Sequence, residues 1–486
     1  MLNFIALMTS SKISNFNIKD ISFINNIRSM AVIGPSKKRN FFFLRNHQEN
    51  FKGDLYAVHP KVKEIPNFPT ENIFSSIKEI PKKVDFAFIN VPAQQVLNVI
   101  DDCVEKGVKL VSIFTAEFSD AGTEEGRQLE KDLIKHAHNK VRLLGPNGLG
   151  LFYPKLGIAW RSKFPTTPGN IGFIGQSGGM CNIVIYTSVE MGINLSKVFS
   201  FGNGADLDLV DILYYLSNDD ETNLILCYLE GIKENRGNDL RQVLANNKKP
   251  IVILKGGKSK SGSIAANTHT ASLSGNTQIW KTLFNQYNLI EVDTLEQMIY
   301  TARLIDFYGI NDLQNIAVLS ISGGYGVVLV DLIEKAGMEI PQFSPKIQKL
   351  LDEKFFIHGT SSKNPLDVAA QLFNSQSIKE IIDLALSDNN IDALIMDLPS
   401  WYFDPSYFIT HDDNFEVNIL EALTLGHKHQ KPLIPIIERA HRPDESYRVS
   451  RLLAKKKVPV FGDPLEFIPL LPKITNFKKK LIIKNE

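Results

Sequence analysis

One repeated pattern constrains this chain more than any other feature of its sequence. A short run of β-branched, aliphatic or aromatic residues ends in a turn of Gly, Pro, Ser or Asn, and a helical stretch follows. Continuous apolar runs that alternate with helices are typical of parallel strands covered by helices on both faces. The pattern therefore predicts an α/β fold built on parallel sheets.

The pattern falls into three blocks, which suits a chain of 486 residues because a domain takes roughly 150. Strands are predicted within 30–34, 55–60, 85–92, 109–115 and 141–147, then within 170–179, 197–202, 223–231 and 250–257, and finally within 315–326, 392–399 and 431–437. We predict three doubly wound units in series: a Rossmann-like domain at 20–150 and two flavodoxin-like domains at 168–309 and 312–472. An irregular linker is expected to end near Pro168.

Composition and charge argue against several classes of protein. The formal net charge of +1 predicts no field that would attract nucleic acid or a membrane surface. No apolar window reaches the ~18 residues of a membrane span, and the N-terminus lacks the basic region and cleavage site of a secretory signal. The three cysteines lie far apart without a CxxC pair, and the histidines show no metal-ligand spacing. These features predict a cytoplasmic protein without a metal site.

Ligands of open α/β sheets bind at the carboxyl ends of the strands, so the turns after the strands are the candidate sites. The first turn, AVIGPS, places Gly34 and Ser36 where backbone N–H groups can reach a phosphate, although a purely structural turn is equally compatible. The second strand ends at Lys61, where a dinucleotide site needs an acidic residue. Lysine fits a phosphorylated ribose, as in NADP or coenzyme A, or it is simply solvated. The third strand ends in a rigid turn that contains Val91 and Pro92.

The sequence GFIGQSGGM carries the strongest local signal. Its strand ends at Gly175, Ser177 is a natural N-cap residue, and Gly178 and Gly179 open the next helix. A helix start without side chains offers free N–H groups and a positive dipole to an anion. The alternative is simple capping with tight packing of the helix on the strand.

A histidine stands among small residues in the stretch AANTHTASLSG. His269 follows the strand PIVILKGG, and its neighbours leave room around the ring. Imidazole is a nucleophile when a carboxylate fixes its tautomer. The strand ILCYLEG ends in Glu230, which parallel pairing would bring to the same sheet edge. A structural or solvated histidine and a solvated glutamate are the alternatives.

Ten motifs, in this order, resemble the α part of the NDP-forming acyl-CoA synthetases, chiefly the ADP-forming acetate–CoA ligases, which are relatives of succinyl-CoA synthetase. The motifs are AVIGPS, VHPK, NVPA, GPNGLG, GQSGG, FGNGADLD, YLEG, THTASLSG, ISGGYG and NPLD, and the resemblance covers roughly residues 28–470. It implies that the first domain binds coenzyme A. The residues so implied are Gly34, Ser36, Lys61, Val91, Pro92 and Asn147.

The resemblance also implies a reaction. Acyl-CoA, ADP and phosphate give a carboxylic acid, CoA and ATP through an acyl phosphate and a phosphohistidine at His269. Glu230 is implied to orient the ring, and the implied phosphate site consists of Ser177, Gly178 and Gly179. The nucleotide site of this family lies in an ATP-grasp module, for which too few residues follow the third unit. ATP, ADP and Mg are therefore expected on a separate β subunit, in an α2β2 heterotetramer.

Several positions depart from the family pattern. KKRNFFF replaces a glycine-richer first turn, Glu117 stands where glycine is common, Gly148 replaces cysteine or serine, and Ala271 replaces glycine. Two other functions are weighed beside the ligase. One is a non-catalytic protein that binds CoA or acyl-CoA, which has no need of His269. The other is an NADP-dependent oxidoreductase, which leaves two of the three units unexplained.

Overall fold

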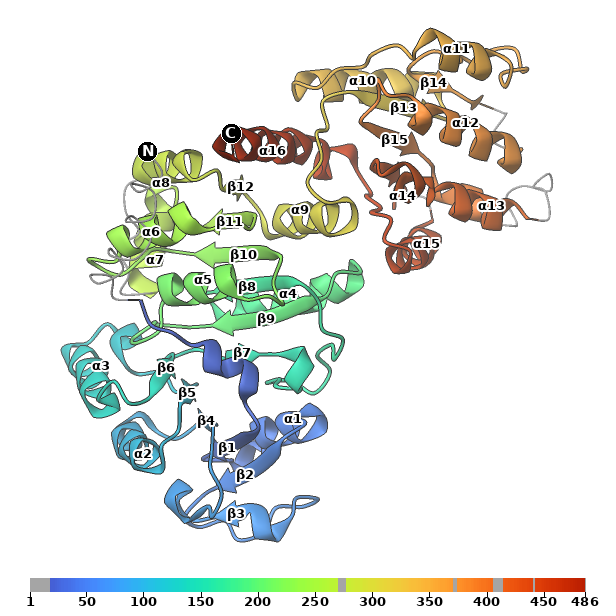
Figure 1. Ribbon diagram of the computed structural model, residues 1–486. Helices are drawn as coiled ribbons and strands as arrows, with labels where there is room; N and C mark the ends of the chain where they lie inside the picture. The colour runs from blue at the N-terminus through green and yellow to red at the C-terminus, as the bar shows by residue number, and fades with distance from the viewer. Residues whose placement is uncertain (1–17, 270–276, 370–373, 405–413, 440–441, 486) are drawn as a thin grey trace, which may run out of the picture. The chain divides into compact units, whose positions relative to one another are not determined.

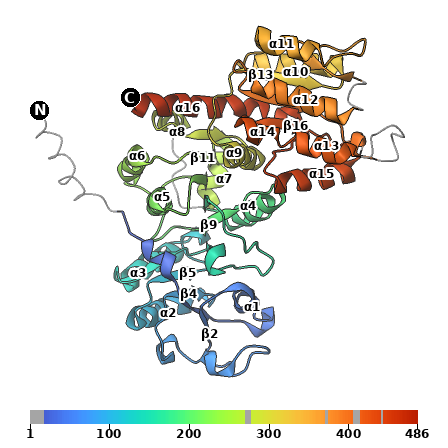
Figure 2. The same ribbon diagram turned by 45° about the vertical axis from the view of Figure 1, so that its right-hand side comes forward.

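The computed structural model contains three sheets within the residues that it describes (Figures 1 and 2). The described residues are 18–269, 277–369, 374–404, 414–439 and 442–485. The chain divides into two compact units, Met1–Tyr186 with Asn194–Tyr287, and Thr187–Ile193 with Asn288–Glu486. Short 3-10 helices punctuate the loops at η1 (Ser22–Asn26), η2 (Lys37–Arg39), η3 (Thr70–Asn72), η4 (Ile77–Glu79), η5 (Ser119–Ala121), η6 (Pro154–Leu156), η8 (Ser400–Phe403), η9 (Pro464–Glu466) and η10 (Ile468–Leu470).

The first sheet has the strand order of a dinucleotide-binding fold, β3-β2-β1-β4-β5-β6, with parallel pairing throughout. Its strands are β1 (Ser29–Ile33), β2 (Asp54–Val58), β3 (Ile73–Phe74), β4 (Phe86–Ile89), β5 (Leu110–Ile113) and β6 (Arg142–Leu144). Its helices are α1 (Phe42–Asn50), α2 (Ala93–Lys106) and α3 (Glu124–Ala137). Ile33 pairs with both Val58 and Ile89, so the turns after β1, β2 and β4 share one edge.

Helices cover both faces of this sheet, which explains why its strands are apolar without alternation. On one face Ala31 and Ile89 share a buried core with Ile100 of α2 and with α3. On the other face Phe43 of α1 packs on Phe88 of β4, with ring centroids 4.7 Å apart. Figures 1 and 2 accordingly show α1 on one side of the strands and α2 and α3 on the other.

The second sheet of the first unit has the order β11-β10-β8-β9-β7. Its strands are β7 (Gly150–Phe152), β8 (Ile171–Gly175), β9 (Leu195–Ser200), β10 (Leu224–Leu229) and β11 (Ile251–Lys255). The helices nearby in sequence are α4 (Gly178–Glu190), α5 (Leu209–Asn218), α6 (Gly237–Asn246), α7 (Lys260–His269) and α8 (Thr277–Gln286). The parallel strands follow a flavodoxin-like order. Strand β7 pairs antiparallel with β9, so the segment expected as an irregular linker begins with a short edge strand.

The second unit contains a third parallel sheet with the order β14-β13-β15-β16, again flavodoxin-like. The strands of this sheet are β13 (Ile316–Ser320), β14 (Leu366–Asp367), β15 (Ala393–Asp397) and β16 (Leu433–Ile436). The unit also contains β12 (Ile290–Val292), which is not part of this sheet. Its helices are α9 (Leu295–Tyr308), α10 (Gly323–Lys335), α11 (Pro345–Asp352), α12 (Ser375–Ser387), α13 (Phe415–Ala422), α14 (Leu425–His429), α15 (Pro443–Lys455) and α16 (Leu471–Asn485). The predicted fold class, an α/β protein with three parallel sheets, is confirmed.

Backbone contacts join the two sheets of the first unit at their carboxyl edges. The N–H groups of Asn203 and Ala205, after β9, donate to the carbonyl oxygens of Pro146 (3.0 Å) and Gly145 (2.9 Å), after β6. A Cβ on Gly148 would lie 2.6 Å from the carbonyl oxygen of Ser200, so a side chain there requires the loops to separate. The close approach accounts for glycine at this position, where the family pattern has a larger residue.

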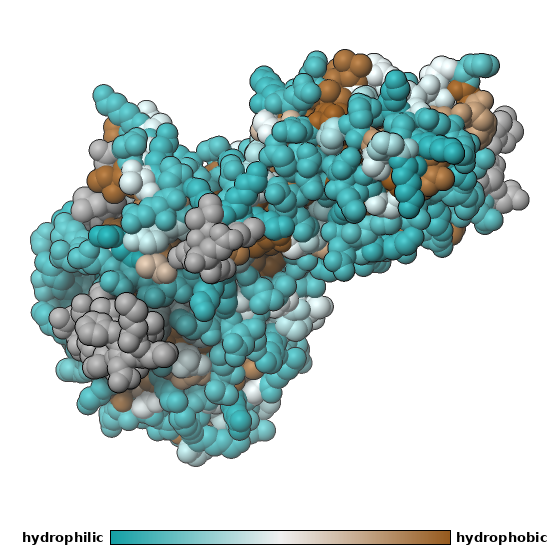
Figure 3. Space-filling view, turned by 45° about the horizontal axis from the view of Figure 1, so that its top comes forward, coloured by the Kyte–Doolittle hydropathy of each residue, from teal (hydrophilic) through white to brown (hydrophobic). Residues whose placement is uncertain are grey.

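Helix α3 turns its polar face outward. In α3, Leu133 and Ala137 are buried four residues apart, while Glu124, Glu125 and Lys135 are exposed. Hydrophilic side chains cover most of the face drawn in Figure 3. Among the described residues, no helix combines the length and apolar character that crossing a membrane requires.

Helix α1 buries a histidine, although the residues around it in the core are apolar. The side chain of His47 is 1% exposed, and its ring centroid lies 5.6 Å from that of Phe88. Neither ring nitrogen has a hydrogen-bond partner within the described chain. Burial lowers the pKa of His47 to about 3, because the charged form loses its hydration.

We expect His47 to make the stability of the chain depend on pH. The folded pKa lies below the unfolded value near 6.5, so the unfolded state binds more protons and stability falls as pH drops below 6.5. From pH 7 to pH 5 this contribution amounts to about 2 kcal/mol. Urea unfolding at both pH values should show this loss in the wild type and a shallower dependence in His47→Phe. The same substitution at the exposed His358 should leave the dependence unchanged.

Candidate functional site

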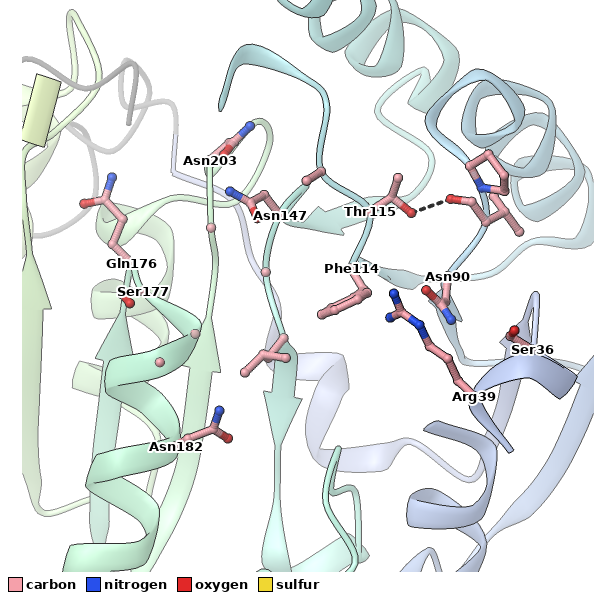
Figure 4. Close-up of a pocket in the computed structure, with 18 of the residues that line it drawn as sticks. Ser36, Arg39, Asn90, Phe114, Thr115, Asn147, Gln176, Ser177, Asn182 and Asn203 are labelled. Carbon is pink, nitrogen blue, oxygen red and sulfur yellow. Dashed lines mark hydrogen bonds between the residues drawn. The ribbon is translucent and has the colours of Figure 1, made fainter. Parts of the chain in front are cut away.

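A pocket of about 640 Å³ opens at the joined carboxyl edges of the first two sheets. It lies at the two positions where the strand order reverses, between β1 and β4 and between β8 and β10, where α/β sheets bind ligands. Figure 4 shows the lining side chains converging from both sheets. The lining residues are Ser36, Arg39, Asn90, Val91, Pro92, Phe114, Thr115, Ala116, Asn147, Gly148, Leu149, Gln176, Ser177, Gly178, Gly179, Asn182, Gly202, Asn203 and Glu230.

The first wall of the pocket is built from the turns after β1 and β4. Gly34 has a φ of +81°, and a Cβ there would lie 2.5 Å from the carbonyl oxygen of Asn90. Glycine is therefore required for the β1 turn to approach the β4 turn. Thr115 holds the β4 turn from the next strand, since its hydroxyl donates to the carbonyl oxygen of Val91 at 2.6 Å (Figure 4). Arg39 reaches into the pocket from η2.

The loop after β6 forms the middle of the pocket. Asn147 has a left-handed φ of 57°, which asparagine tolerates better than most residues. Its N–H donates to the carbonyl oxygen of Thr115 at 2.9 Å. The loop is thus tied to the first sheet, and it presents Asn147 and Leu149 to the pocket.

The second wall begins at the N-terminus of α4. The hydroxyl of Ser177 lies 3.5 Å from the N–H of Met180, and its carbonyl accepts from Cys181 at 3.1 Å. The first N–H groups of a helix have no partner within it, so those of Gly178 and Gly179 are available to a ligand. A Cβ on Gly179 would meet only the Ser177 hydroxyl, at 3.7 Å. The open helix start, with its positive dipole, can hold an anion such as phosphate.

Glu230 follows β10 and stands on the same wall, with 8% of its surface exposed. Its carboxylate accepts from the Tyr228 hydroxyl at 3.0 Å, and its N–H donates to Oε1 of Gln176 at 3.0 Å. The ammonium of Lys255 donates to its carbonyl oxygen at 2.6 Å. Burial lowers the pKa of Lys255 to about 8, against the opposing effect of Glu230, and burial also raises the pKa of Tyr228. These contacts fix a carboxylate that can accept a hydrogen bond from an imidazole N–H.

Most of the site residues predicted from the sequence line this one pocket. They are Ser36, Val91, Pro92, Asn147, Ser177, Gly178, Gly179 and Glu230. Gly34 shapes the adjoining turn, and Lys61 is exposed in the loop after β2, on the same sheet edge but outside the lining. The backbone of His269 ends α7, but its side chain lies outside the described part of the structure.

Sequence reasoning missed several lining residues, chiefly Arg39, Asn90, Phe114, Thr115, Gln176, Asn182 and Asn203. Asn90, Gln176 and Asn203 lie inside the turn motifs NVPA, GQSGG and FGNG, so the position after a strand would have identified them. Asn182 lies inside a helix and carries no such signal. Among the described lining residues, Arg39 is the single cation and Glu230 the single carboxylate. Within the described chain, no group of three or more His, Cys, Asp or Glu side chains is placed to hold a metal ion.

Comparisons with known proteins match the two segments of the chain that form the two walls of the pocket to two protein families. Residues 28–154 match a CoA binding domain, and residues 168–305 match the succinyl-CoA ligase like flavodoxin domain. The chain is 34% identical to the α subunit of ADP-forming acetate–CoA ligase II of Pyrococcus furiosus, over 77% of this chain and 81% of that protein. It is 29% identical to the ADP-forming 4-hydroxybutyrate–CoA ligase of Nitrosopumilus maritimus, over 89% of this chain but 61% of that longer protein.

A solved structure shares the fold over nearly the whole chain. The dinucleotide-forming acetyl-coenzyme A synthetase 1 of Ca. Korarchaeum cryptofilum, in complex with phosphate and ADP, superposes with a TM-score of 0.82. The two are 26% identical, and the match covers 96% of this chain and 99% of that one.

The contact between Gln176 and Glu230 yields a stability prediction. Gln176→Met removes the acceptor of a buried N–H group, and an unsatisfied buried donor costs about 1–3 kcal/mol. We expect urea unfolding to show a loss of that size. Gln242→Met, at an exposed position of α6, is the matched control and should change the free energy of unfolding by less than about 0.5 kcal/mol. Equal losses in both variants would contradict a structural role for the Gln176 side chain.

Proposed function

The chain belongs to the family of ADP-forming acyl-CoA ligases, as a homologue of their α subunits, and from this premise we propose that it acts through a phosphohistidine. The overall reaction would convert acyl-CoA, ADP and phosphate into a carboxylic acid, CoA and ATP. One observation carries the proposal: the fixed carboxylate of Glu230 and the anion-binding start of α4 line one pocket with residues of the CoA binding domain. A protein that only bound CoA would need neither the carboxylate nor the anion-binding helix start.

We propose that coenzyme A is held by the first wall, with Ser36, Val91, Pro92 and Asn147 as contacts. The polar neutral groups on this wall, which include Asn90 and Thr115, suit the amide and hydroxyl groups of a pantetheine chain. The thioester would then lie beside Asn147, facing the start of α4.

In the first proposed step, a phosphate oxygen attacks the thioester carbonyl. The C–S bond breaks, CoA leaves as the thiolate and is protonated, and an acyl phosphate forms. The N–H groups of Gly178 and Gly179, together with the hydroxyl of Ser177, would hold the phosphoryl oxygens and stabilise their negative charge. The step needs no redox partner.

In the second proposed step, the imidazole of His269 attacks phosphorus and the carboxylate leaves. Glu230 would accept a hydrogen bond from the other ring nitrogen, which keeps the attacking nitrogen unprotonated and stabilises the charged product. The phosphoryl group would then pass from His269 to ADP and give ATP.

We propose that the last transfer takes place on a partner β subunit that carries an ATP-grasp module, ADP and Mg, in an α2β2 assembly. The relative from Pyrococcus furiosus is itself named as an α subunit, and this chain covers 81% of it. The acid is proposed to be a short-chain carboxylic acid, of which acetate is one candidate. One relative is named for acetate and another for 4-hydroxybutyrate, so membership of the family does not select between them.

The decisive test is covalent labelling with acyl-CoA and radiolabelled inorganic phosphate, both for the chain alone and for the assembled α and β subunits. We expect acid-labile, base-stable label in the wild type and none in His269→Ala. Glu230→Gln should reduce the rate of labelling by at least about 10-fold, because the ring loses its orienting carboxylate. His358→Ala is the matched control. Label that survives His269→Ala would overturn the assignment, and an unlabelled wild type that binds CoA would favour the non-catalytic CoA-binding alternative.

The proposed role of Lys61 has its own test. If its ammonium binds the ribose phosphate of coenzyme A, the wild type should bind CoA more tightly than dephospho-CoA, by about 1.5- to 5-fold for an exposed ion pair. Lys61→Ala should remove that preference and leave the affinity for dephospho-CoA unchanged. Isothermal titration measures both ligands. Lys140→Ala, at another exposed position of the same domain, should keep the preference.

A further inference from the structure

Asn182 lies in the second turn of α4, just beyond the helix start that forms the anion site. Figure 4 shows its side chain extending from α4 toward the space that Phe114 enters from the opposite wall. Leu149 also lines the pocket. Phe114 and Leu149 thus add apolar surface to a lining in which Asn182 provides a polar amide.

The orientation of that amide is set by Trp160. The indole N–H of Trp160 donates to Oδ1 of Asn182 at 2.9 Å. Because an indole nitrogen only donates, the amide oxygen must face it, and the NH₂ group takes the other side. The assignment of oxygen and nitrogen therefore follows from chemistry.

Trp160 cannot easily move away from Asn182. It is 1% exposed, and its ring packs against those of Phe152 and Phe164, with ring centroids 6.1 Å and 5.4 Å away. Its own carbonyl oxygen accepts from the side chain of Asn46 at 2.7 Å. The buried indole thus holds Asn182 as a fixed hydrogen-bond donor, for which the described residues supply no acceptor.

The spacing along α4 relates this donor to the anion site. Asn182 follows Gly179 by three residues and Gly178 by four, which at 1.5 Å per residue is roughly 4.5–6 Å along the helix axis. An acyl phosphate whose phosphoryl group lies at the helix start, and whose carbon chain runs along α4, would bring its second to fourth carbon to the Asn182 amide. The methylene groups would lie against Phe114 and Leu149.

We infer that Asn182 selects the acid, and that the preferred substrate carries a hydroxyl oxygen on its second to fourth carbon, where the reacting carboxyl carbon is the first. This inference rests on the proposed function. A site that hydrogen-bonds a substrate oxygen discriminates strongly against the analogue without it, because the polar group of the protein is then left unpaired. Unsubstituted short acids are consequently poorer substrates.

The test uses the assembled α and β subunits and two matched pairs of acids, butyrate with 4-hydroxybutyrate and propionate with 3-hydroxypropionate. The measured quantity is the ratio of kcat/KM for the substituted acid to that for the plain acid. We expect a ratio of at least about 10 for one pair in the wild type. Asn182→Leu should lower that ratio about 10-fold, and Trp160→Phe, which keeps the amide but frees it to rotate, should lower it less. Asn246→Leu, on the exposed face of α6, is the matched control and should leave the ratio unchanged.

Other outcomes are equally informative. A wild-type enzyme that turns over acids without preference overturns the inference while the proposed function stands. A rise in the KM for CoA with an unchanged acid ratio in Asn182→Leu also overturns it, because the amide would then bind the pantetheine chain. A wild type that activates no acid at all overturns both proposals together.

Discussion

The site depends on the backbone contact between the loop after β6 and the loop after β9. The N–H groups of Asn203 and Ala205 donate to carbonyl oxygens of the GPNG segment, and Gly148 and Gly202 lie where a Cβ would collide with the facing backbone. This contact brings the carboxyl edges of two independent sheets together. Without it, the turns of the first sheet and the start of α4 would still form, but they would not share a pocket.

The two sheets contribute different parts of the pocket. The reversal of strand order in the first sheet leaves a crevice whose polar lining groups are uncharged except for Arg39, and the reversal in the second leaves a helix start beside a carboxylate. The described charges in the pocket are few, with Arg39 on the first wall and Glu230 on the second. A phosphoryl group held at α4 would therefore be stabilised mainly by N–H groups and the helix dipole, which need no proton transfer.

The position of the Glu230 carboxylate is fixed by its neighbours. Three residues hold it from two strands and one turn: Tyr228 at the carboxylate, Gln176 at the N–H and Lys255 at the carbonyl. Because Gln176 and Lys255 are buried and Tyr228 is half-buried, a change in any of them should alter the position of the carboxylate. Asn182, farther along α4, is likewise fixed by a buried neighbour, because the indole N–H of Trp160 orients its amide.

The sequence by itself determined the three-block α/β fold, the parallel strands and the turns at Gly34, Ser177 and Glu230. These are local properties, set by hydrophobic patterning, capping and the conformational freedom of glycine. Only the tertiary structure decided that β7 is an edge strand, that Gln176 holds Glu230 and that Trp160 orients Asn182. Each of these contacts joins residues more than 20 positions apart. Such contacts depend on the topology of the fold and on side-chain packing, and neither produces a periodic pattern of residues in the sequence.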